Sequence, residues 1–194
     1  MNKVNIIKEL LKNKPELISN AIYERSVDFI NAVLNMPEWQ NPKFEKLLTA
    51  NIWKSNLEDI RIILKMPEWN NPIFQGVLTS SIWRSNASEV KAILKLEEWK
   101  KPYFQNLLAP TIWHSTVQEI EAILRMPEWN EPRFQQLLTP NIWNCNFEDV
   151  KTILSMPEWK EQNFQKLLTS SIWNCNIQTV IEVLRMSELE IMPN

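Results

Sequence analysis

The chain has 194 residues and a formal net charge of −2, with one glycine beside ten tryptophans and twelve prolines. A slightly negative charge argues against a generally basic coat for nucleic acid, although it leaves the distribution of the charges open. No stretch reaches the ~18 apolar residues that a membrane span needs. Residues 1–11 are too short and too interrupted by charge for a signal peptide, so we expect a soluble, cytoplasmic protein without membrane contact.

The first 35 residues contain a degenerate copy of a pattern that becomes regular further along the chain. Residues 21–34 keep the register of the later copies, with Tyr23 where those have tryptophan, whereas residues 6–19 match poorly. The terminal units of a repeat array have no neighbour on one side and need a capping sequence. Residues 1–35 are therefore predicted to form a degenerate N-terminal capping unit.

Residues 36–185 contain five copies of a 30-residue unit. Each copy opens on Met-Pro-Glu-Trp or a variant and continues to Leu-Leu-Thr-x-x-Ile-Trp or a variant, so all ten tryptophans fall at two repeat positions. The openings stand at Met36, Met66, Leu96, Met126 and Met156. A fixed period of this length is typical of repeat architectures. We therefore predict one all-α domain over residues 1–194, a right-handed helical-repeat solenoid with a truncated C-terminal cap at residues 186–194.

Each repeat is predicted to contain a capped helix. Asn56 stands three residues before Asp59, which places a capping side chain at the N-cap and an acid at N3. The helix should end near Lys65, because Pro67 disfavours helical geometry at the residue before it. The same start is repeated at Asn86, Thr116 and Asn146.

The rest of each repeat is predicted to add one or two shorter helices, for two or three per unit. A turn with Glu68 and Trp69 leads to a second helix that opens at Pro72 and runs through Leu78, since proline suits the first helical position. Thr139-Pro140 repeats this start for a third, very short helix.

Two segments resemble a known family. Residues 146–157 (Asn-Phe-Glu-Asp-Val-Lys-Thr-Ile-Leu-Ser-Met-Pro) and residues 10–18 (Leu-Leu-Lys-Asn-Lys-Pro-Glu-Leu-Ile) resemble the repeat of the mitochondrial transcription termination factor family. More weakly, Leu138-Thr139-Pro140 is similar to the start of the TAL effector repeat. Both families are DNA-binding helical solenoids, so the resemblance implies binding to DNA.

Two positions four residues apart, on the side of the capped helices predicted to face solvent, are basic in seven of ten cases. Stacked repeats would align these cations into a stripe able to hold phosphates. The alternative is that cations near helix C-termini only complement the helix dipole. The stripe consists of Arg61, Lys65, Lys91, Lys95, Arg125, Lys151 and Arg185.

A second candidate surface is the position after each Ile-Trp, which varies while staying polar. Such variation between constant neighbours would suit a reader of bases, because arginine favours guanine and asparagine favours adenine in a major groove. An unconstrained solvated loop position would show the same variation. The position holds Lys54, Arg84, His114, Asn144 and Asn174.

No catalytic, cofactor or metal site is expected. His114 is the only histidine, so a metal set or proton relay lacks a second member. Cys145 and Cys175 occupy one repeat position and should be too far apart for a disulfide. A single glycine excludes a glycine-rich phosphate loop. Because the tryptophans are constant beside isoleucines, we expect them in the core.

The sequence therefore predicts a non-enzymatic, monomeric binding module. Double-stranded DNA, held through its phosphates by the basic stripe, is the favoured partner. The alternative is a protein-binding or peptide-binding solenoid, since a glutamate follows the proline position in every repeat and could form an acidic edge. A third possibility is that the chain is a structural spacer or an oligomerising element.

Overall fold

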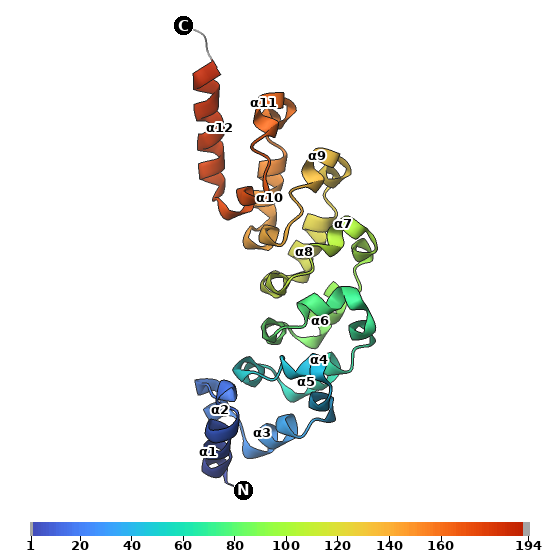
Figure 1. Cartoon of the computed structure of the whole chain (residues 1–194), viewed down its shortest axis with the longest axis vertical. Helices are drawn as coiled ribbons and strands as arrows, with labels where there is room; N and C mark the ends of the chain where they lie inside the picture. Colours follow the sequence, from blue (N-terminus) through green and yellow to red (C-terminus); the bar gives the residue numbers. More distant parts are fainter. Residues whose placement is uncertain (1, 192–194) are drawn as a thin grey trace. The chain divides into compact units, whose positions relative to one another are not determined.

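The computed structural model describes residues 2–191, with side chains for residues 2–186. Within this part of the chain every regular element is a helix and no strand occurs, so the fold is all-α. The chain divides into two compact units, Met1–Lys95 and Leu96–Asn194. Each unit is described by itself, and the helices are labelled in Figure 1.

The first unit begins with helices that precede the regular repeats and continues with the first two repeats. Its elements are α1 (Lys3–Asn13), η1 (Pro15–Leu17), α2 (Asn20–Glu24), α3 (Val27–Leu34), η2 (Pro37–Gln40), α4 (Pro42–Glu45), η3 (Ala50–Lys54), α5 (Leu57–Leu64), η4 (Pro67–Asn70), η5 (Pro72–Val77), η6 (Ser80–Arg84) and α6 (Ala87–Leu94). The eight-residue helices α3, α5 and α6 pack in sequence, α3 on α5 and α5 on α6.

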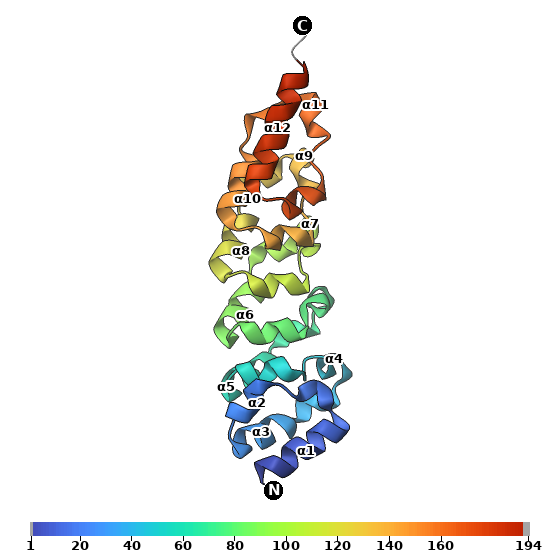
Figure 2. The same ribbon diagram turned by 90° about the vertical axis from the view of Figure 1, so that its left-hand side faces the viewer.

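The second unit contains the same order of four elements three times, and its last helix, α12, is the fourth element of the third copy. They are η7 (Glu97–Lys100), α7 (Pro102–Gln105), η8 (Pro110–His114), α8 (Val117–Leu124), η9 (Pro127–Asn130), α9 (Pro132–Gln135), η10 (Pro140–Asn144), α10 (Phe147–Leu154), η11 (Pro157–Lys160), α11 (Gln162–Gln165), η12 (Ser170–Asn174) and α12 (Ile177–Ile191). Figure 2 shows α8, α10 and α12 following one another, and α10 contacts both of the others.

Four helical segments per sequence repeat, rather than the expected two or three, form this order. The predicted turn with Glu68 and Trp69 is a 3-10 helix, because proline at its first position fixes a helical φ and donates no N–H. The second helix ends at Val77, before Leu78. Leu78 has φ −73° and ψ 77°, and the Thr79 N–H donates to the Val77 carbonyl at 2.9 Å, which is an inverse γ-turn.

The capped helices start where the sequence predicts. The Asn56 side chain accepts the Asp59 N–H at 2.8 Å, and α5 ends at Leu64 with Lys65 as its C-cap. The reciprocal bond from the N-cap N–H occurs where the third helical residue is glutamate, as in Asn86 with Glu89. Aspartate is one methylene shorter, and Asp59 instead accepts the amide of the Asn56 side chain.

The last helix does not end at the sequence boundary after Arg185. It continues to Ile191, and Ser187 stands where four of the five other copies have proline and the fifth has Glu97. Serine supplies the N–H that proline lacks, which permits the continuation. The N–H alone does not cause it, because α6 ends at Leu94 although Glu97 is not proline. The predicted truncated cap at residues 186–194 therefore begins inside α12, and residues 192–194 lie outside the described part of the chain.

Both rows of tryptophan are anchored by hydrogen bonds from the indole N–H to backbone carbonyls. The tryptophan of Met-Pro-Glu-Trp reaches six residues back, as Trp129 does to Ile123 at 2.6 Å. The tryptophan of Ile-Trp reaches 36 residues back into the preceding repeat, as Trp173 does to Leu137 at 2.6 Å. A buried indole needs such a partner, so these bonds join successive repeats within each unit.

Candidate functional site

The seven predicted stripe residues are all exposed. Arg61, Lys91 and Lys151 stand in the last turn of their helices, while Lys65 and Lys95 are C-caps. This placement satisfies the helix-dipole explanation as well as the phosphate explanation. The two readings therefore have to be separated by what surrounds each cation.

The structure brings four of the seven cations to one groove in the first unit. Arg61 and Lys65, from α5 and its C-cap, and Lys91 and Lys95, from α6 and its C-cap, line a groove of about 470 Å³. Because α5 and α6 pack against each other, equivalent cations of the two helices share this surface. Ile62, which is 41% exposed, adds an apolar side chain to the lining.

Two acids partly neutralise the positive charge of this groove. Glu58 and Glu68 also belong to its lining. One carboxylate oxygen of Glu68 is buried, and no hydrogen-bond partner reaches it from the described residues. Equivalent oxygens of Glu98, Glu128 and Glu158 are buried in the same way, so this is a feature of the repeat. The groove thus presents four cations and an apolar side chain beside two acids.

In the second unit the predicted cations have other neighbours. Arg125 forms an ion pair with Glu98, with 2.7 Å between Nε and Oε1, and a second one with Glu121. Lys151 Nζ lies 5.9 Å from the ring centroid of Phe147 in its own helix. Arg185 is exposed on α12. A cation that is already paired with an acid is less available to an external anion. The first unit is therefore the stronger candidate for an anion-binding site.

Glu98 is held ionised by this contact. Its burial raises the pKa of the carboxyl, but the hydrogen bond from Arg125, a backbone hydrogen bond and the charges of Arg125 and Lys101 together hold the pKa below its ordinary value. The sequence showed both residues but not this pairing, which joins positions 27 residues apart.

The charges are divided unevenly between the two units. Residues 1–95 contain thirteen lysines and arginines against ten acids, whereas residues 96–194 contain eight against thirteen. The first unit is therefore net positive and the second net negative. The overall charge of −2 conceals this difference.

The variable polar positions form a different surface. Lys54, Arg84, His114, Asn144 and Asn174 are each exposed at the end of a 3-10 helix. Lys54 and Arg84 line a second groove of about 340 Å³ together with Arg25. This groove includes the N-cap of α5, whereas the basic groove includes its C-cap, and eight helical residues span about 12 Å.

Arg25 is a groove residue that reasoning from the sequence missed. It occupies the repeat position of the buried Ser55 and Ser85, and its guanidinium donates to the carbonyls of Trp53 at 2.6 Å and Ser55 at 3.1 Å. The signal was an arginine in the worn first copy at a position that later copies reserve for a small residue.

The cysteines are free thiols. Cys145 is half-buried and donates to the Trp173 carbonyl at 3.3 Å, whereas Cys175 is exposed. Burial, reinforced by the negative charge of Asp149, raises the pKa of the Cys145 thiol. Among the residues described, no group of three or more histidines, cysteines and acids is placed to hold a metal ion.

The chain matches no protein-family model, no curated protein and no solved structure. The resemblance to mitochondrial termination factor and TAL effector repeats therefore stays an expectation. Within residues 2–191 no helix has the length and apolar character needed to cross a membrane.

Proposed function

We propose that the chain is a non-enzymatic helical-repeat module, a solenoid that binds double-stranded DNA through the phosphate backbone. The observation that carries the proposal is the groove of the first unit, where Arg61, Lys65, Lys91 and Lys95 converge in the positively charged part of the chain. Phosphate contacts supply most of the sequence-independent affinity for DNA.

The spacing of the groove suits a polyanion. Packed helices lie about 8–10 Å apart, and each strand of a duplex carries one charge per about 3.4 Å of axis. The basic pairs of α5 and α6 can therefore face phosphates two to three positions apart on one strand. A row that continues through the second unit would need Arg125 to exchange its acidic partners for phosphate.

Sequence reading is a secondary part of the proposal. Lys54 and Arg84 lie in the groove near the N-cap of α5, away from the basic groove. Backbone contact thus does not require base contact, and we expect binding that depends weakly on DNA sequence.

The experiment is a fluorescence anisotropy titration of the full chain with a random duplex across a salt series. Four neutralised phosphates predict a slope of log K against log salt of roughly −3 to −4. The double variant Lys91→Ala/Lys95→Ala should reduce the magnitude of this slope by about 2, because each lost phosphate contact removes about 0.9.

A matched control removes the same charge elsewhere. Lys100 and Lys160 are exposed in the second unit, so Lys100→Ala/Lys160→Ala should leave the slope within about 0.5 of the parent value. Equal effects of the two double variants, or no binding of duplex by the parent chain at low salt, would reject the groove as a DNA site.

A peptide is the second candidate ligand, and one feature of the same groove favours it. Ile62 is exposed among the four cations and offers apolar contact. An acidic peptide with an apolar side chain would use both kinds of group. Ile62→Ser would weaken such a peptide but leave duplex affinity unchanged, and this difference separates the two ligands.

A further inference from the structure

Exposed large apolar side chains gather at the two ends of the described chain. Seven are exposed among the described residues, and Ile62 is the only one outside the terminal regions. The other six are Val4, Leu11 and Tyr23 near the start and Leu167, Val183 and Met186 near the end. Apolar surface at both ends of a stacked array is the part that a neighbouring repeat would cover.

The interior repeats show what covers this surface. Leu137, at the repeat position of Leu167, is fully buried, and its carbonyl accepts the indole N–H of Trp173 from the next repeat. Ile153, at the repeat position of Val183, is fully buried as well. Leu137 is thus covered by a 3-10 helix bearing Ile-Trp, since η12 packs on η10, whereas α10, the helix of Ile153, packs on α12.

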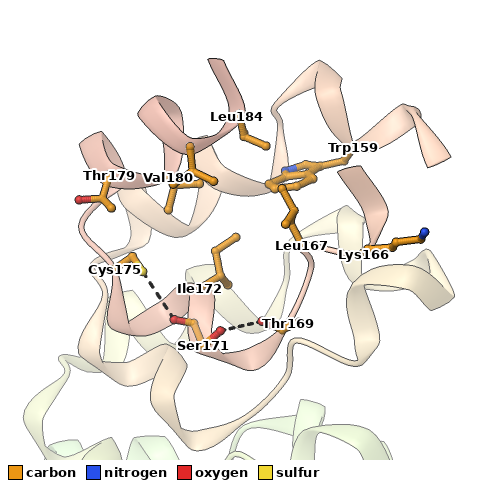
Figure 3. Close-up of a pocket in the computed structure, with 11 residues that line it drawn as sticks. Trp159, Lys166, Leu167, Thr169, Ser171, Ile172, Cys175, Thr179, Val180 and Leu184 are labelled. Atoms are coloured by element: carbon orange, nitrogen blue, oxygen red, sulfur yellow. Dashed lines mark hydrogen bonds between the residues drawn. The ribbon is translucent and has the colours of Figure 1, made fainter. Parts of the chain in front are cut away.

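The C-terminal face consists of the exposed side chains of Leu167 and Val183 over the buried Ile172 and Val180, and it lacks this cover in the part of the chain that the structure describes. Leu167 is 40% and Val183 45% exposed, and they line a cavity of about 230 Å³ within the last repeat, which includes the start of α12 (Figure 3). The Leu167 carbonyl accepts the Thr169 N–H at 2.9 Å, as Leu137 does from Thr139. Within the described residues no indole donates to the Leu167 carbonyl.

At the other end of the chain, the N-terminal face is the exposed ring of Tyr23, and Val4 and Leu11 are exposed on α1. Tyr23 stands at the repeat position of Trp53, and it is 53% exposed where Trp53 is fully buried. Tyr23 belongs to α2, which follows Ser19 as η3 follows Thr49. A phenol presents an apolar ring with an O–H donor, so it can replace an indole against a carbonyl.

The charges of the two ends are complementary. Residues 1–14 contain four lysines and one glutamate, whereas residues 176–194 contain three glutamates and one arginine. This contrast follows the wider division into a positive first unit and a negative second unit. Opposite charge favours contact between different ends over contact between like ends.

We propose that two copies of the chain associate head to tail, with the Tyr23 ring of one copy covering the C-terminal face of the other. The contact continues the interface that already joins successive repeats inside each unit. It is heterologous, so each copy uses one face of each kind, and association continues beyond a pair into a ring or an open filament. This departs from the monomer expected from the sequence.

Sedimentation velocity of the full chain over a wide concentration range tests the proposal without any nucleic acid. The mean mass should rise with concentration beyond that of a dimer. Tyr23→Gln and Val183→Glu, each at an exposed site, should weaken association by about tenfold or more. Ile62→Gln, at the exposed apolar residue outside the ends, should associate like the parent.

Mixing the variants distinguishes head-to-tail contact from contact between like faces. Tyr23→Gln keeps a good C-terminal face and Val183→Glu keeps a good N-terminal face, so an equimolar mixture should form dimers that grow no further. Circular dichroism and tryptophan fluorescence should confirm that each variant is folded. A parent that stays monomeric at all concentrations, or a mixture no more associated than its separate components, would overturn the proposal.

Discussion

At the scale of the residue, the tryptophans do more than fill a core. Their constancy beside isoleucine predicted burial, and Trp53, Trp83 and Trp143 are buried. The sequence could not predict that the indole N–H bonds to a carbonyl 36 residues earlier, because this requires the stacking of two repeats. The bond to Leu47 from Trp83, at 2.6 Å, shows how one side chain joins repeat to repeat.

Trp83→Phe tests the weight of this bond. The change removes a buried donor and part of a ring, so unfolding free energy should fall by about 2–4 kcal/mol. Trp39→Phe is the control, because Trp39 is only part-buried and its bond reaches just six residues back to Val33, so the loss should be about 1.5 kcal/mol or less. Equal losses in urea denaturation would show that the bond across repeats has no special role.

The two thiols should differ in reactivity. Because the thiolate is the nucleophile, the raised pKa of Cys145 and its burial should slow its alkylation by iodoacetamide at neutral pH. Cys175 is exposed and should react first, at least about tenfold faster. Peptide mass spectrometry after timed quenching gives both rates, and similar rates would contradict the difference in environment.

At the scale of the element, proline and capping residues allowed helix boundaries to be predicted from the sequence. The start of α5 at Asn56 and its end before Pro67 followed from local chemistry alone. The extra 3-10 helix at Pro67 did not, since a turn and a single 3-10 turn have the same proline at their start. The γ-turn at Leu78 could not be predicted either, because no residue type is specific to such a turn.

Ser187→Pro tests whether proline at this repeat position ends the capped helix. Proline would remove the N–H of residue 187 and disfavour helical geometry at Met186. Helix α12 should then end near Arg185, and the loss of residues 186–191 from the helix should lower the far-ultraviolet circular dichroism. Ser187→Ala should preserve or raise it, because alanine favours helix. An unchanged spectrum for Ser187→Pro would mean that proline does not set this boundary.

At the scale of the whole molecule, the repeat register predicted rows of cations but not their partners. Arg61, Lys65, Lys91 and Lys95 meet in one groove as the register implies. Arg125 holds the same repeat position as Lys95, yet it is paired with Glu98 and Glu121. Which acid lies beside which cation depends on side-chain reach across repeats, and a linear pattern does not contain that information.

Glu98→Gln measures the stability that this pairing gives. Since the folded chain holds the pKa of Glu98 below the ordinary value, the ion pair stabilises the fold above that value and loses its effect as pH falls through the folded-state pKa. Glu98→Gln should therefore be less stable than the parent at pH 7, with the difference shrinking towards pH 3. Urea midpoints across this range, with Glu97→Gln as an exposed control, give the answer, and a constant difference would refute the linkage.

The same substitution tests whether acids keep the second unit out of the DNA contact. Without Glu98, Arg125 retains only Glu121 and becomes available to phosphate. If the freed Arg125 takes part in the proposed DNA binding, the salt slope for duplex binding should steepen by up to about 0.9, the contribution of one phosphate. Glu97→Gln removes an equal charge beside Lys100, away from Arg125, so it controls for the net charge of the unit. Steepening by Glu98→Gln alone would place Arg125 on the DNA path, whereas an equal response to both variants would reduce the effect to overall charge.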